Sequence, residues 1–199
     1  MMKKLSNYLN EGYYIACVDL EATCCNRGTI ARGESEIIEF GCSIYDSMNK
    51  TIVEEFNVFV RPVIHPKLTK FCKELTTIEQ EQVDTADVWE DVVKKISEVF
   101  SKYDNLIWVS WGSYDRLMIE QTSARLMIKN PMPENHFNLK IVHSGIIRVK
   151  NAPRGIGLKS AVDRAGITFE GTLHRACDDA RAVAKVLNHF THDFRDKKL

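Results

Sequence analysis

Three strand-like segments follow one another in the first third of the chain. Residues 13–20, 36–46 and 51–62 are rich in apolar and β-branched side chains, a composition typical of strands. The short polar stretch 47–50 is suited to a hairpin turn, and Pro62 ends the series. The order of these segments predicts a β-meander at the start of the fold.

The rest of the chain alternates between helical segments and a further strand. Residues 105–110 are apolar and short, which predicts a buried strand. Ser113 is suited to be the N-cap of the helix that follows it. Four segments are interpreted as helices: residues 88–100, 113–128, 157–166 and 176–190. A meander followed by alternating helices and strands predicts an α/β domain around a mixed sheet.

Composition limits the other possibilities. A chain of 199 residues with 44% hydrophobic content fits one domain with a good core. We expect residues 1–12 to be an N-terminal extension and residues 13–199 to be the domain. No apolar run is long enough for a signal peptide or a membrane helix, so we expect a cytoplasmic protein with no membrane partner. Six cysteines without a CxxC pair predict reduced thiols rather than disulfides or zinc.

Two carboxylates stand where the first strand ends. Asp19 and Glu21 are two residues apart, so their side chains point to the same face of the strand. Two like charges at this separation raise each other's pKa unless a cation lies between them. The pair is therefore either hydrated at the strand's end or a cation site, and the segment alone leaves both interpretations open.

Three further residues are ordinary one by one. Asp115 and Asp179 each fall in the first turn of an expected helix, where acids complement the helix dipole. His174 lies in the loop that precedes the last helix. Together with Asp19 and Glu21 they form a pattern of acids at element ends, with a histidine five residues before the last acid.

The charges are balanced overall but unevenly distributed. With 27 basic and 27 acidic residues, the molecule has no long-range attraction for a polyanion. Residues 135–162 nevertheless contain no Asp or Glu, while they carry several cations and histidines: His136, Lys140, His143, Arg148, Lys150, Arg154 and Lys159. This basic strip either docks phosphates or is simply a solvated cationic face.

The segments "DLEATC", "WGSYDRLMIEQ" and "HRACDDARAVAKVL" resemble, in that order, the three motifs of the DEDDh 3′-to-5′ exonucleases, which have the ribonuclease H-like fold. The further segments "SEIIEFGCSIYD" and "FCKELTTIEQEQVD" are similar to the subgroup of histone-mRNA and enhanced-RNAi exonucleases and bacterial KapD. Thr77 departs from that subgroup, which has glycine there. The chain also has no room for the extra nucleic-acid-binding domain of the animal members, so we do not expect stem-loop recognition.

The resemblance implies a fold, a metal site and a reaction. It implies a central mixed five-stranded sheet flanked by helices, and two Mg²⁺ or Mn²⁺ ions held by four acids: Asp19, Glu21, Asp115 and Asp179. Hard oxygen ligands suit these ions. His174 would accept the proton of the attacking water, and Glu21 would also contact the terminal nucleotide. Leu20, Ala22 and Thr23 are the other implied substrate contacts.

The implied substrate is single-stranded nucleic acid with a free 3′ end, with RNA favoured and nucleoside 5′-monophosphates as products. Arg27, Arg32 and the basic strip are expected to grip its phosphates. The alternatives are a DNA exonuclease, a phosphatase of the haloacid dehalogenase type, suggested by "DLEAT", and a non-catalytic nucleic-acid-binding module. The sequence does not indicate an oligomeric state.

Overall fold

The computed structural model of the chain describes residues 4–31, 33–147, 152 and 154–196. The sheet contains five strands: β1 (Tyr14–Ala22), β2 (Ile37–Asp46), β3 (Thr51–Phe59), β4 (Leu106–Ser110) and β5 (His136–Asn138). The described helices are α1 (Leu5–Asn10), α2 (Lys70–Thr76), α3 (Gln80–Asp84), α4 (Trp89–Phe100), α5 (Tyr114–Arg125), α6 (Leu139–Ile147), α7 (Leu158–Arg164) and α8 (Ala176–Asp196).

The five strands form one mixed sheet in the order β3-β2-β1-β4-β5. The antiparallel pairs β1–β2 and β2–β3 form the expected meander, while β4 runs parallel to β1 and β5 runs parallel to β4. This arrangement confirms the expected fold class. The pattern of the sequence located only four of the strands, because β5 has three residues and falls inside the basic strip.

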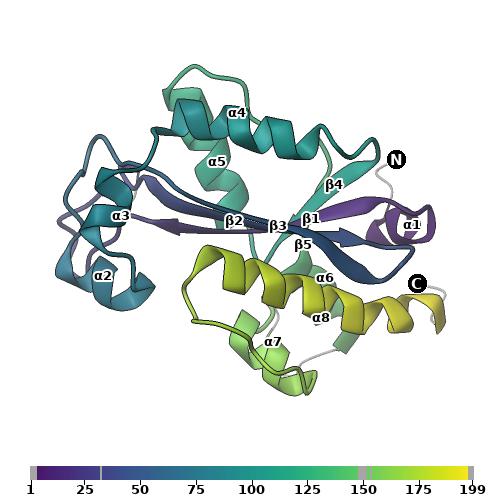
Figure 1. The fold of residues 1–199 in the computed structure, drawn as a ribbon. Coiled ribbons are helices and arrows are strands. Elements are labelled where there is room, and N and C mark those ends of the chain that lie inside the picture. Colours follow the sequence, from purple (N-terminus) through teal and green to yellow (C-terminus); the bar gives the residue numbers. More distant parts are fainter. Residues whose placement is uncertain (1–3, 32, 148–151, 153, 197–199) are drawn as a thin grey trace.

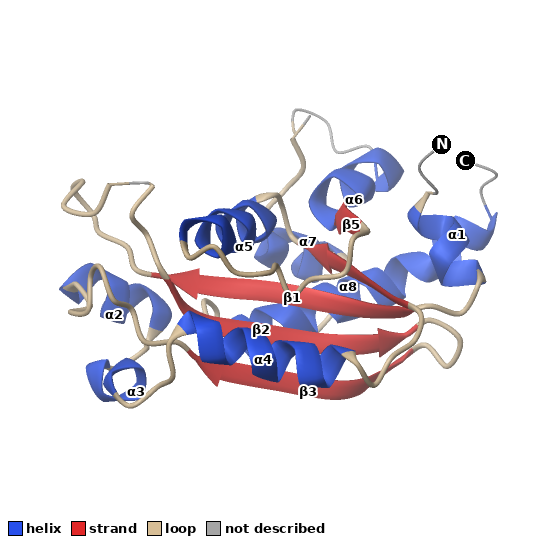
Figure 2. Ribbon diagram, turned by 90° about the horizontal axis from the view of Figure 1, so that it is seen from above, coloured by secondary structure: helices blue, strands red, loops and turns tan. Residues whose placement is uncertain are grey.

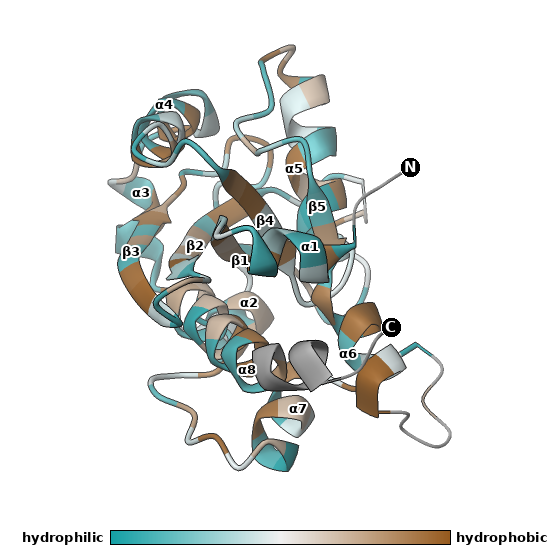
Figure 3. Ribbon diagram, turned by 90° about the vertical axis from the view of Figure 1, so that its right-hand side faces the viewer, coloured by the Kyte–Doolittle hydropathy of each residue, from teal (hydrophilic) through white to brown (hydrophobic). Residues whose placement is uncertain are grey.

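Helices cover both faces of the sheet. Figure 1 shows α4 and α5 over one face, and α8 over the other with α6 and α7 beside it. Side chains alternate between these two layers along β1. Ala16 and Val18 pack in the cluster that contains Trp89 of α4, while Ile15 and Cys17 pack with Leu187 of α8. In Figure 3 the hydropathy colouring marks β4 as hydrophobic, as expected for a strand inside the sheet.

The short helices lie at the two ends of the sheet. β1 points toward α2 and α3, and α1 lies at the opposite end (Figure 2). The expected extension therefore contains a helix, α1, and this helix buries Leu5, Tyr8 and Leu9 in the cluster of the α8 layer. The assignment of residues 13–199 as the domain remains a prediction.

Two local expectations concern caps and thiols. Ser113 does precede α5, but its φ and ψ of −112° and −3° are not those of an extended N-cap, and its hydroxyl instead accepts a hydrogen bond from the Asn138 side chain. All six cysteines are free thiols, as predicted. In the described part of the chain no helix is both long and apolar enough to span a membrane.

Candidate active site

β1 carries the first two acids onto the α8 face of the sheet. Ile15 and Cys17 point to this face, and the next two positions of the same parity are Asp19 and Glu21. Asp19 is half-buried and Glu21 is buried. The apolar face of the strand thus continues into two carboxylates where β1 ends.

The beginning of α8 supplies two more groups. Asp179 lies in its first turn and is buried, whereas His174 lies in the preceding loop and is exposed. The backbone N–H of His174 donates to Asp179 Oδ2 at 3.0 Å. Glu21, His174 and Asp179 each offer one potential ligand atom, and the three atoms lie within 4.8 Å of one another. Residues that are more than 150 positions apart in the sequence therefore converge on one point.

Asp115 lies in α5, which follows β4, the strand that runs parallel to β1. The pairing of β4 with β1 ends at Ser110 opposite Val18, so the edge of β1 beyond Val18 is not paired with β4. The Leu20 backbone and the Ser110 hydroxyl lie near the Asp115 carboxylate, and both lower its pKa against the effect of burial. Asp115 is buried in the first turn of α5. Its carboxylate therefore lies near the part of β1 that contains Asp19 and Glu21.

Burial raises the pKa of all four carboxyl groups, and repulsion from nearby acids adds to the effect. Burial raises the pKa of Glu21 to about 8, with Asp179, Glu39 and Asp115 adding to the effect. Burial also raises the pKa of Asp115 and of Asp179 to about 6. The pKa of Asp19 is raised by burial first and then by the charges of Asp115 and Asp179. The four acids therefore form one cluster of interacting negative charge.

A bound cation fits this cluster. Asp179 Oδ1 is buried and has no hydrogen-bond partner within the described residues. Across the same part of the chain, none of the four acids forms a salt bridge with Lys or Arg. Oxygen and imidazole donors with an unsatisfied buried oxygen are suited to a divalent metal ion.

The chain matches the RNase_T exonuclease family over residues 16–187, which is most of its length. It belongs to this exonuclease family. Membership confirms the predicted family and excludes the haloacid dehalogenase alternative.

Individual exonucleases support the narrower resemblance. The chain is 28% identical to the Schizosaccharomyces pombe 3'-5' exonuclease eri1 over 202 residues, covering 87% of this chain and 66% of that protein. It is 32% identical to the probable 3'-5' exonuclease KapD of Bacillus subtilis over 158 residues, covering 79% and 74%. The nuclease domain of 3'hExo, described as a DEDDh family member bound to rAMP, superimposes with a TM-score of 0.82 at 27% identity, covering 92% and 93%. The chain thus spans just under two thirds of the S. pombe exonuclease.

The other expected substrate contacts have partners inside the fold. Leu20 is buried in the core cluster of the α4 layer. The Ala22 carbonyl accepts a hydrogen bond from the Cys72 thiol, and the buried Thr23 hydroxyl accepts one from the Glu36 N–H. These contacts hold the backbone that follows Glu21, and the substrate-binding role of the three residues remains a prediction.

The basic strip divides between core, surface and undescribed positions. His143 is buried and His136 shares a hydrogen bond with Ser110, and burial lowers the pKa of each to about 4. Lys159 pairs with Asp163, whereas Lys140 is half-buried. Arg154 and Arg27 are exposed, while Arg32, Arg148 and Lys150 lie outside the described residues. The two histidines are therefore packing residues rather than phosphate contacts.

The sequence analysis missed two residues beside the site. Glu39 has no solvent exposure and pairs in register with Glu21. Arg175 follows His174 directly and forms a salt bridge with Glu39 at 2.9 Å. The sequence feature that could have identified Glu39 is its charge within the apolar run "EIIEFG".

Proposed function

We propose that this chain is a metal-dependent 3′-to-5′ exoribonuclease that hydrolyses single-stranded RNA and releases nucleoside 5′-monophosphates. The observation that carries the proposal is the convergence of Glu21, His174 and Asp179 within 4.8 Å at the end of β1. Asp19 and Asp115 complete the cluster through their electrostatic interaction with one another and with Asp179. Membership in the exonuclease family supports the same reaction class.

The four acids would hold two Mg²⁺ or Mn²⁺ ions. Asp19, Glu21, Asp115 and Asp179 offer only oxygen atoms, which these hard cations prefer over softer donors. Such ions, when bound, activate water and stabilise the leaving 3′-oxygen of a phosphodiester.

His174 would accept the proton of the attacking water. It is exposed in the loop before α8, so its ring can reach a substrate that enters from solvent. Histidine is the side chain that most often accepts and returns protons in enzymes at neutral pH. Glu21 would in addition contact the terminal nucleotide, beside the backbone of Ala22 and Thr23 and the apolar Leu20. Capture of the 3′ end by these residues would make the enzyme an exonuclease.

RNA is the proposed polymer rather than DNA because of the relatives. The 3'hExo nuclease domain, which superimposes on 92% of this chain, was solved with rAMP, a ribonucleotide. Recognition of the 2′-hydroxyl is the chemical difference that a protein can use to distinguish the two polymers.

The test is degradation of matched single-stranded RNA and DNA oligonucleotides that carry a 5′ label. We expect a ladder that shortens from the 3′ end, faster on RNA, with nucleoside 5′-monophosphates identified by mass spectrometry. An oligonucleotide with its 3′ end blocked is the substrate control, and an Asp19→Asn variant is the protein control. Internal cleavage of the blocked RNA would contradict the exonuclease mode, and equal rates on DNA would contradict the RNA preference. Binding without cleavage would indicate the non-catalytic module.

A further inference from the structure

Glu39 of β2 holds the first residues of α8. Its two oxygens accept hydrogen bonds from the Arg175 guanidinium, with Nη2 to Oε1 at 2.9 Å and Nε to Oε2 at 3.2 Å. Oε2 also accepts the Ala176 N–H at 3.0 Å, and Oε1 accepts the Asn57 side-chain amide at 2.9 Å. A buried carboxylate with a bidentate arginine and two further donors is a rigid anchor.

A second contact fixes the same stretch of backbone. Gly41 lies two residues from Glu39, on the same face of β2. A Cβ at Gly41 would come within 2.1 Å of the Ala176 carbonyl carbon, so the start of α8 lies directly against the strand. The Arg175 guanidinium also lies 5.4 Å from the centre of the Phe59 ring, which restricts its side chain further.

These contacts end immediately beside His174. Its backbone has a φ of 62°, in the left-handed region that residues other than glycine seldom adopt. The residue after it is held by Glu39, and its own N–H is held by Asp179. The direction in which the loop presents the imidazole is therefore set by contacts on both sides of His174.

We propose that Glu39 and Arg175 are positioning residues that orient His174 for proton transfer, an inference that rests on the exonuclease function proposed above. Neither residue has to touch substrate in order to act. Their effect passes through the backbone at His174, and loss of the anchor leaves the four acids in place while the imidazole becomes misaligned.

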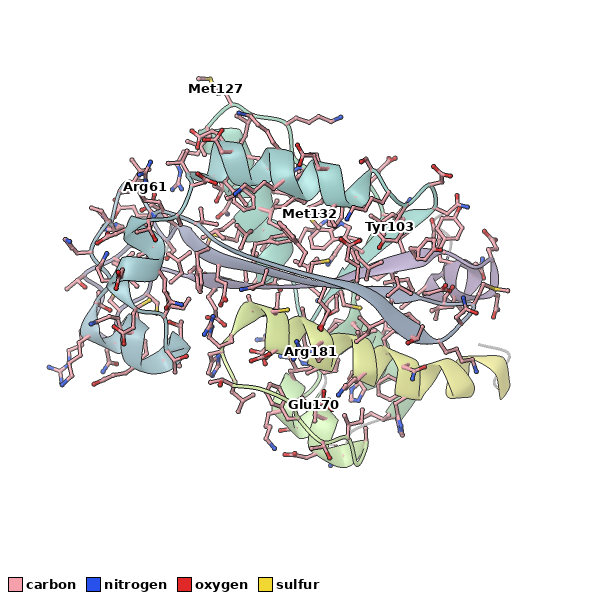
Figure 4. The ribbon with its side chains drawn as sticks, in the orientation of Figure 1. Arg61, Tyr103, Met127, Met132, Glu170 and Arg181 are labelled. Atoms are coloured by element: carbon pink, nitrogen blue, oxygen red, sulfur yellow. The ribbon has the colours of Figure 1, made fainter. Side chains whose placement is uncertain are left out.

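The test compares Glu39→Gln and Arg175→Lys with a matched control, Arg181→Lys. Arg181 lies on α8 (Figure 4), and it also joins this helix to the sheet, through a hydrogen bond from Nε to Glu55 Oε1 at 2.7 Å. The Arg181 side chain is 23% exposed and the Arg175 side chain is 25% exposed, so the two Arg→Lys substitutions are matched in the exposure of the arginine, while Glu39 is fully buried and Glu55 is 36% exposed. Arg175→Lys keeps the charge but not the bidentate geometry, and Glu39→Gln keeps an acceptor for the Ala176 N–H.

We expect kcat to fall up to about 100-fold in the two anchor variants, as misplacement of a catalytic group does, with KM little changed. In a His174→Ala background, Arg175→Lys, which keeps the charge beside the acid cluster, should cause no further loss, because its effect passes through the absent ring. The imidazole NMR signals of His174 should shift in both anchor variants, independently of activity, and stay unchanged in Arg181→Lys. Unchanged His174 signals, or equal losses of kcat with and without His174, would overturn the proposal. If the His174 signals shift in both anchor variants but the wild-type chain degrades no RNA, the proposed function is contradicted while the positioning contact is retained.

Discussion

His174 differs from the other four residues of the proposed site. The three acids Glu21, Asp115 and Asp179 are buried and Asp19 is half-buried, but His174 is exposed. It is held through its backbone N–H, which leaves the imidazole to interact with substrate and water. A proton acceptor needs this combination of a fixed backbone and an accessible ring.

Replacement of His174 by alanine tests its role. We expect His174→Ala to lower kcat by roughly 10²- to 10⁴-fold, the usual contribution of a positioned general base. The pH dependence of kcat should differ between the wild type and the variant, because the variant lacks the group that accepts the proton. Metal affinity, measured by Mn²⁺ titration, should hardly change because the carboxylates remain. Near-normal turnover with the same pH profile would show that His174 only packs at the entrance.

Substitution of a carboxylate should abolish metal binding, in contrast to His174→Ala. Asp19→Asn or Asp179→Asn removes a charged metal ligand, so we expect both activity and Mn²⁺ binding to be lost while the far-UV circular dichroism is retained. Asp163→Asn is the control, because Asp163 is exposed on α7 and pairs with Lys159. Turnover of the wild type in excess chelator would contradict the metal requirement.

At the scale of the elements, α2 ends in a strained turn. Its C-cap is Thr77, with a φ of 59°, and the Thr77 N–H donates to the Lys73 carbonyl. This left-handed conformation is unfavourable for a β-branched residue and favourable for glycine. The requirement explains why the related exonucleases are expected to have glycine at this position, and it shows that Thr77 keeps the same backbone at a cost.

Thr77→Gly should therefore stabilise the protein. We expect the free energy of unfolding to rise by up to about 1 kcal/mol, since relief of left-handed strain exceeds the entropy that glycine adds to the unfolded chain. Thr85→Gly is the matched control at the C-cap of α3, where φ is −93°, and it should lower stability. Denaturant unfolding measures both effects, and a Thr77→Gly variant less stable than wild type would refute the strain argument.

For the whole molecule, the acid cluster should make the metal-free protein pH-sensitive. The pKa of Glu21 rises from an ordinary 4.5 to about 8 in the folded state. Between these values the folded protein keeps a proton that the unfolded chain releases, so the free energy of unfolding falls as pH increases. Metal ions compete with the same protons, so they should restore stability most at high pH.

The measurement is the melting temperature at pH 5.5 and pH 8, with chelator and with Mn²⁺. We expect the melting temperature in chelator to be lower at pH 8 and the gain from Mn²⁺ to be larger there. Glu21→Gln should flatten the dependence in chelator. A melting temperature in chelator that rises with pH would show that the pKa of these acids is not raised in the folded protein.

Substrate binding should depend on salt through a small number of cations. Arg27 and Arg154 are exposed, and each phosphate contact on a single strand contributes a slope of about −0.7 to the dependence of log affinity on log salt. We expect Arg27→Gln and Arg154→Gln each to weaken RNA binding and to reduce this slope by about 0.7. Lys94→Gln, which removes a cation paired with Asp91 on α4, is the control. Identical slopes in all three variants would place the phosphate contacts elsewhere.

The sequence determined the features that depend on neighbours along the chain. Strands β1 to β4 and helices α4, α5, α7 and α8 follow from local apolar periodicity, which reports the face that each segment buries. Asp19, Glu21, Asp115, His174 and Asp179 stand at or next to the ends of such segments, and the resemblance to the DEDDh motifs implied that they form one site. The ends of these segments meet in space, since the mixed sheet places the end of β1 beside the starts of α5 and α8.

Only the tertiary structure decided the remaining features. β5 is three residues long and is a strand only because β4 lies beside it. His136 and His143 belong to a basic segment, yet packing makes one a partner of Ser110 and buries the other. Glu39 and Arg175 are 136 residues apart, and no local pattern predicts that they meet. A buried ion pair of this kind forms where the strand and the helix are brought together, because a charge leaves water only when a partner is already in place.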